Sequence, residues 1–213
     1  AATLVKDING SSQVYSSSPG NITLVNLTVF FTANDGNRGT ELWKTDGTTA
    51  TLVRDINPGS GSSSPSNLTA VEDKLFFTAN DGVSGTELWV SDGTEEGTVL
   101  VADIRPGSGS SSPGSFVNFN GTLFFRANDG ARGVELWKSD GTRTGTVQVA
   151  DINGGTQSSS PSNLTVVDLN GWGGVTGLRL FFSATTTGGT GTGTELYISD
   201  GTKAGTVRLL DIR

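Results

Sequence analysis

The sequence has 213 residues and a formal net charge of −7, and 31 of its residues are glycine, about twice the usual share. It contains neither histidine nor cysteine, which excludes disulfides, zinc sites of the His/Cys kind and Ser-His-Asp or Cys-His catalysis. The acidic charge argues against nucleic acid as a partner, and no run of about 18 apolar residues is present that would insert into a membrane.

The first element in chain order is a short apolar segment at 3–8, which predicts a strand. Its closing Asp-Ile pair recurs at 55–56, 103–104, 151–152 and 211–212, whereas every other block of the sequence occurs only four times. The segment 3–8 is therefore a surplus strand. Because an unpaired apolar edge is a liability in soluble proteins, we expect this strand to pair head to tail with another molecule or to continue a longer array. The residues expected to form that contact are Leu4, Val5, Asp7 and Ile8.

A Ser-rich loop ending at Pro19 comes next, and its low complexity is typical of a solvated connection. Four short segments follow it, rich in β-branched and aromatic residues and bounded by Gly, Asn or Asp, and they predict strands near 21–27, 29–34, 40–45 and 51–56. The Asn-Asp-Gly and Asp-Gly steps between them tolerate positive φ and predict hairpin turns.

The same blocks return with a period of 48 residues in the first three intervals, which predicts an all-β fold of four repeats in one domain, 1–213. The expected repeats are 9–56, 57–104, 105–152 and 153–213. Segments such as Leu75-Phe76-Phe77 are apolar on both faces, so each four-stranded antiparallel sheet should lie between two others. This arrangement favours a β-propeller of four blades, with a linear stack of sheets as the alternative.

A motif, Glu-Leu-Trp-x-x-Asp-Gly-Thr, stands at 41–48, 87–94 and 135–142, and again at 195–202 with Tyr197 in place of Trp. The chain thereby resembles the bacterial repeat family that is named after this motif. The resemblance covers essentially the whole chain and implies a secreted or cell-surface protein built from tandem copies. It implies no settled chemistry.

Two sets of residues are candidates for ligand contact. Trp172 lies in an inserted Gly-rich loop, where an exposed indole is expected. The Asn-Asp pairs of the hairpins could bind a glycan or calcium, although their turn-forming chemistry explains them equally well, and they are Asn34, Asp35, Asn80, Asp81, Asn128 and Asp129. The column formed by Trp43, Trp89, Trp137 and Tyr197 could stack on sugars, but packing between sheets is the favoured interpretation.

The sequence thus predicts an extracellular or cell-surface structural and adhesion module that partners with itself, assembling into filaments or surface arrays through strand pairing. The alternative is a lectin-like carbohydrate-binding propeller, with calcium as a candidate aid. One Glu per repeat does not single out a catalytic pair, so no enzymatic activity, catalytic residue, cofactor or metal site is expected.

Overall fold

The structure of the chain, a computed structural model, describes residues 4–10, 16–170, 176–187 and 192–210. These residues form four four-stranded antiparallel sheets and no helix, which confirms the all-β prediction. In every sheet the strands are hydrogen-bonded in sequence order, so each sheet is a simple meander. None of the described residues belongs to a helix that could span a membrane.

The strands lie close to the predicted positions, and each sheet falls within one predicted repeat. The first sheet consists of β1 (Gly20–Val25), β2 (Thr28–Asn34), β3 (Thr40–Thr45) and β4 (Ala50–Arg54). The second consists of β5 (Ser66–Val71), β6 (Lys74–Asn80), β7 (Thr86–Ser91) and β8 (Val99–Ala102). The third consists of β9 (Gly114–Phe119), β10 (Thr122–Asn128), β11 (Val134–Ser139) and β12 (Val147–Ala150). The fourth consists of β13 (Ser162–Asp168), β14 (Leu178–Thr186), β15 (Gly193–Ser199) and β16 (Val207–Leu210).

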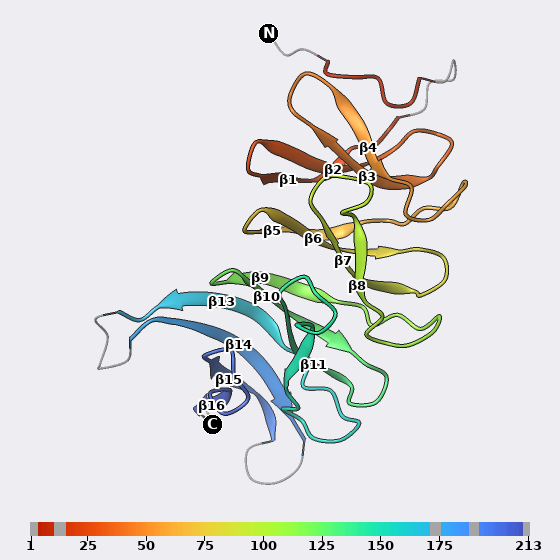
Figure 1. The fold of residues 1–213 in the computed structure, drawn as a ribbon. Helices are drawn as coiled ribbons and strands as arrows, with labels where there is room; N and C mark the ends of the chain where they lie inside the picture. Colours follow the sequence, from red (N-terminus) through yellow and green to blue (C-terminus); the bar gives the residue numbers. More distant parts are fainter. Residues whose placement is uncertain (1–3, 11–15, 171–175, 188–191, 211–213) are drawn as a thin grey trace. The chain divides into compact units, whose positions relative to one another are not determined.

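The chain divides into two compact units, Ala1–Ser110 and Ser111–Arg213, each of which holds two sheets. In Figure 1 the β1–β4 sheet lies directly above the β5–β8 sheet of the same unit. The closed ring of four blades, the linear stack and the single domain 1–213 stay predictions.

Each unit has an apolar core between its two sheets. In the first unit Phe30 and Leu42 of one sheet pack with Phe77 and Trp89 of the other. In the second unit the same arrangement joins these residues: Phe124, Leu136, Phe182 and Tyr197. In β2, β6 and β10 two consecutive Phe residues, which point to opposite faces of the sheet, are both buried. These strands therefore lack the alternation of a half-solvated sheet.

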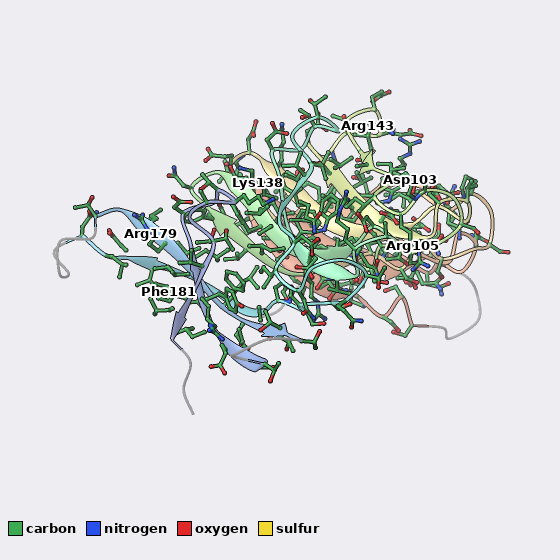
Figure 2. The ribbon with its side chains drawn as sticks, turned by 90° about the horizontal axis from the view of Figure 1, so that it is seen from below. Asp103, Arg105, Lys138, Arg143, Arg179 and Phe181 are labelled. Atoms are coloured by element: carbon green, nitrogen blue, oxygen red, sulfur yellow. The ribbon has the colours of Figure 1, made fainter. Side chains whose placement is uncertain are left out.

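One lysine in each unit adds a polar link between the sheets. Lys44 Nζ donates a hydrogen bond to the carbonyl oxygen of Gly93 at 2.8 Å, and Lys138 Nζ donates to that of Gly201 at 2.9 Å. Lys138 is labelled in Figure 2. Because each lysine reaches the Asp-Gly-Thr turn of the next sheet, it contributes to the alignment of the two sheets.

The surplus strand predicted at 3–8 is not a strand in the part of it that the structure describes, 4–8. This segment instead lies against the first sheet of its own unit, with Ile8 on a cluster that includes Phe31 and Trp43. Lys6 Nζ donates to the carbonyl oxygen of Ala50 at 3.0 Å. The segment therefore already has a partner surface within its own chain, which the strand-pairing prediction did not allow for.

Candidate functional site

The most elaborate polar clusters of the first and third repeats are built around the Glu of the motif. Glu41 lies on β3 with no exposed surface, and its Oε1 accepts a hydrogen bond from the backbone N–H of Ser63 at 2.8 Å. Its Oε2 accepts from the N–H of Ile56 at 3.0 Å and from the Ser63 hydroxyl at 2.5 Å. The carboxylate thus joins β3, the turn after β4 and the Ser-rich loop. We call the set Glu41, Ile56 and Ser63, with its counterparts in other repeats, the Glu–Ser clip.

The third repeat reproduces the clip in detail. Glu135 accepts from the N–H groups of Ile152 and Ser159, both at 2.8 Å, and from the Ser159 hydroxyl at 2.7 Å. In the second repeat Glu87 accepts from the N–H of Ile104 at 3.0 Å. In all three repeats the Glu carboxylate accepts a hydrogen bond from the N–H of the Ile that follows the last strand of its sheet.

The Ser-rich loop of the clip also reaches the following sheet. The carbonyl oxygen of Ser63 accepts from the N–H of Asn80 at 3.0 Å, and that of Ser159 accepts from Thr185 at 2.8 Å. The middle serines are almost fully buried: Ser63, Ser111 and Ser159. The interpretation of these loops as solvated connections agrees with exposed residues such as Ser62 and Ser64 but is wrong for the middle serines. Ser63 and Ser159 each satisfy polar groups of two successive sheets.

Burial sets the protonation behaviour of the clip. Loss of water raises the pKa of Glu41 and Glu135 above the ordinary value, and the negative charges of Asp55 and Asp151 act in the same direction. The hydrogen bonds from Ser63 and Ser159 oppose this rise. A raised pKa is typical of a general acid, but a carboxylate that is buried and already accepts three hydrogen bonds holds the backbone in place.

The Asp of the motif forms a second, local cluster. Asp92 Oδ1 accepts from the N–H of Thr94 at 2.8 Å and from its hydroxyl at 2.7 Å, and the Thr94 hydroxyl accepts from Gly97 N–H at 2.9 Å. Beneath the turn, the hydroxyls of Ser91 and Thr98 are 2.7 Å apart. The hydrogen bonds from Thr94 lower the pKa of Asp92 and outweigh its slight burial. This Asp therefore organises its own turn.

Two members of the aromatic column, Trp89 and Tyr197, lie between the two sheets of their units. Trp43 lies on the first sheet under the N-terminal segment, and Trp137 is half-buried. Trp43 and Trp89 are each 5% exposed, and Tyr197 is 6% exposed. Trp89 lies 6.5 Å from Phe77, and Tyr197 stacks on Phe182 at 5.7 Å, both measured between ring centroids. The rings of Trp43, Trp89 and Tyr197 therefore cannot offer an open face to a sugar, and packing accounts for these three residues.

The candidate Asn-Asp pairs form three separate turns. Asn34 Oδ1 accepts from the N–H of Gly36, and Asp35 Oδ1 accepts from the N–H groups of Asn37 and Arg38. The Arg38 guanidinium lies 2.6 Å from Asp35 Oδ2. Burial raises the pKa of Asp35, but these hydrogen bonds and the Arg38 charge outweigh it, so that the pKa lies below its ordinary value.

The other two turns follow the same pattern. Equivalent backbone bonds are made by these residues: Asn80, Asp81, Asn128 and Asp129. Among the residues that the structure places, no hydrogen bond or ion pair joins one turn to another, and no cluster of three or more acidic side chains is arranged to hold a metal ion. Trp172, the other ligand candidate, lies outside the described residues.

A surface groove beside the first sheet has a volume of about 840 Å³. The N-terminal segment contributes Lys6 and Asn9 to its walls, β3 contributes Trp43, and the Asn-Asp-Gly loop contributes Asp35 and Arg38. Lys6 Nζ lies 5.4 Å from the centre of the Trp43 ring and covers it. The groove therefore offers a mixed charged lining, with its indole shielded.

Reasoning from the sequence missed the Glu–Ser clip, although a signal was present. The partners are separated by 22 residues in the first repeat and 24 in the third, and the same Ser triplet precedes each proline. The middle Ser of the triplet, 22 or 24 residues after the Glu of the motif, is the feature that would have identified the contact.

Comparison with known proteins defines the class of fold. No model of a known protein family matches the chain, and no curated protein does. Among solved structures it is similar to a prolyl endopeptidase at 14% identity and a TM-score of 0.52, over 86% of this chain and 24% of that one. This likeness shows the fold alone, and the chain spans about a quarter of that protein.

Two other similar structures are carbohydrate-active enzymes. An α-L-arabinofuranosidase from Clostridium thermocellum matches at 15% identity and a TM-score of 0.38, over 94% of this chain and 73% of that one. An endo-1,4-β-xylanase from Bacteroides thetaiotaomicron matches at 14% identity and a TM-score of 0.37, over 93% and 73%.

These similarities correct one prediction. The prediction that the chain is not an enzyme is corrected: the solved structures to which it is similar include glycoside hydrolases, at about 15% identity. That prediction rested on the absence of His and Cys and on the one Glu per repeat, which singles out no catalytic pair. Neither observation excludes carboxylate-based hydrolysis, which requires no His and no Cys.

Proposed function

We propose that the chain is a structural repeat module in which the motif holds successive sheets together. The observation that carries this proposal is that the motif residues are used internally. Glu41 and Glu135 are saturated by hydrogen bonds, Trp89 is packed between sheets, and Asp92 organises its turn. A motif repeated for recognition would instead keep some of its polar groups directed toward solvent.

The proposed setting is a secreted or cell-surface protein of bacteria. The resemblance to the Glu-Leu-Trp-x-x-Asp-Gly-Thr family supports this setting, and so does an acidic composition rich in Gly and without Cys. The likeness to the prolyl endopeptidase supports blade-like sheets of the β-propeller type. Closure into four blades, adhesion and filament formation are further parts of the proposal.

The structural role is tested by separating stability from binding. We expect beads coated with the protein to bind a surface only where that surface carries further copies of the protein. The soluble protein should give no saturable signal on a glycan array. Several specific glycan signals would contradict a purely structural role.

A second candidate function is carbohydrate binding in the groove beside the first sheet. The specific observation is its lining by Asp35, Arg38 and Asn9, planar polar groups of the kind that bind sugar hydroxyls. If the groove binds a glycan, Arg38→Ala should abolish the array signal, measured with and without calcium. The matched control is Arg132→Ala, which removes the same salt bridge with Asp129 from the equivalent turn of the third sheet.

A further inference from the structure

Residues that follow the last strand of the first sheet contact the second sheet. Ile56, which follows β4, packs in the core that holds Phe77 and Trp89 of the second sheet. Asn57 then approaches the next Asn-Asp-Gly turn so closely that a Cβ at Gly82 would lie 2.7 Å from Asn57 Oδ1. The Asp-Ile-Asn end of one sheet is thus an anchor for the next.

The N-terminal segment reproduces this anchor on the first sheet without belonging to any sheet. Ile8 packs on the cluster of Phe31 and Trp43, which are the counterparts of Phe77 and Trp89. Asn9 is 6% exposed, and a Cβ at Gly36 would lie 2.9 Å from its Oδ1. Residues 4–9 therefore occupy the position that the end of a preceding sheet would take.

The N-terminal segment does not reproduce the Glu–Ser clip, because it supplies no Glu. Ser17 accepts from the N–H of Asn34 at 2.9 Å, as Ser63 accepts from Asn80. However, the hydroxyl and N–H of Ser17 and the N–H of Ile8 find no acceptor among the described residues, and Ser17 is half-buried where Ser63 is 1% exposed. The two Ser17 groups that would hold a Glu are in place, and the neighbouring Ser16 lines the groove of about 840 Å³.

The fourth sheet offers the complementary surface. Leu196 is 36% exposed, whereas its counterparts Leu42 and Leu136 are fully buried. Phe181, labelled in Figure 2, is half-buried, while its counterparts Phe30 and Phe124 are each 2% exposed. Glu195, on the same strand as Leu196, is half-buried as well. Side chains at the same positions of the first and third sheets, Phe30, Leu42, Phe124 and Leu136, pack toward the following sheet of the same unit.

We propose that residues 4–9 are a displaceable plug, and that a second copy of this chain docks its β13–β16 sheet on the first sheet when the plug leaves. In this contact Glu195 of one copy binds the Ser17 N–H and hydroxyl of the other, and Leu196 packs near Trp43. The inference rests on the structural role proposed above. A tethered plug acts at an effective concentration on the order of millimolar, so it excludes a micromolar second copy from the intact chain.

The experiment compares the intact chain with a chain lacking residues 1–9, by sedimentation over a range of concentrations. We expect the intact chain to stay monomeric and the shortened chain to form dimers or longer head-to-tail assemblies. Adding Leu196→Glu to the shortened chain places a charge in the proposed contact and should restore the monomer. Because Leu196 is already partly exposed, this substitution should leave the fold intact.

A second variant tests the proposal even if the shortened chain does not fold. The full-length chain carrying Lys6→Ala, Ile8→Ser and Asn9→Ala keeps the segment but loosens its hold, and it should associate more strongly than the intact chain. A monomeric mass for both variants would overturn the proposal, and so would assembly that Leu196→Glu does not suppress. Specific glycan binding would contradict the proposed structural role but would change neither the mass of the variants nor the effect of Leu196→Glu. Failure of the structural role and failure of the plug proposal are therefore distinguishable.

Discussion

At the scale of single residues, the structure depends on buried carboxylates that are fully paired. Glu41 and Glu135 lie in apolar surroundings, where an ionised group is costly unless several donors surround it. Here two backbone N–H groups and one hydroxyl supply those donors. Removing such an acceptor leaves buried donors unpaired, which costs more than the hydrogen bonds contribute in net terms.

The substitution Glu41→Gln tests this pairing. The amide keeps the shape but replaces one acceptor oxygen by a donor, so the N–H of Ser63 or of Ile56 loses its partner. We expect the free energy of unfolding to fall by about 1–3 kcal/mol, measured by urea denaturation. Glu195→Gln is the matched control, because the same motif position is half-buried there, and its loss should be smaller. Equal losses would show that burial of the clip is unimportant.

At the scale of elements, the Asp-Gly-Thr turns fix how the third and fourth strands of a sheet are connected. In the second repeat the turn is closed by Asp92, Thr94 and Thr98, with Gly97 directly beside the carboxylate. Gly93 has φ of 92°, a conformation that a side chain would strain. Local chemistry alone therefore determines this turn.

Gly97→Ala tests the turn. The added Cβ would overlap the Asp92 carboxylate, which must then move and give up its hydrogen bonds to Thr94. We expect a loss of about 0.5–3 kcal/mol in thermal or urea denaturation. Glu96→Ala changes the neighbouring exposed residue of the same turn and should be nearly neutral. A neutral Gly97→Ala would mean that the turn tolerates a displaced Asp92.

At the scale of the whole molecule, two sets of carboxylates respond to pH in opposite directions. Turn hydrogen bonds lower the pKa of Asp92 and Asp200 below the ordinary 3.8, so the unfolded chain binds more protons in acid and stability falls below about pH 4. Burial raises the pKa of Glu41 and Glu135 above 4.5, so the stability they contribute is present below that value and is lost as the pH rises through the raised pKa.

We therefore expect the free energy of unfolding to be greatest between about pH 4 and 5, measured by urea denaturation across the pH range. The double variant Glu41→Gln, Glu135→Gln should flatten the decline above pH 4.5 and leave the acid decline unchanged. If the free energy of unfolding of this variant still declines above pH 4.5, groups other than Glu41 and Glu135 cause the decline.

Much of the fold was predictable because its signals are local. The predicted strand 40–45 agrees with β3 at both ends, since β-branched and aromatic residues bounded by Gly and Asp specify a strand and its turns without reference to distant parts of the chain. The Asn-Asp-Gly turns were predictable for the same reason. The surplus strand at 3–8 was not, because the same Asp-Ile sequence is a strand end only when a neighbouring strand is present to pair with it.

The sequence by itself determined the repeat, the strand order within each sheet and the all-β class, because these follow from residue types at short range. Only the tertiary structure decided what the repeated polar residues do. Glu41 and Ser63 are separated by 22 residues in the chain, and nothing in either local sequence states that the hydroxyl will meet the carboxylate. That contact forms because folding removes both groups from water, and a buried polar group is stable only where another buried polar group satisfies it.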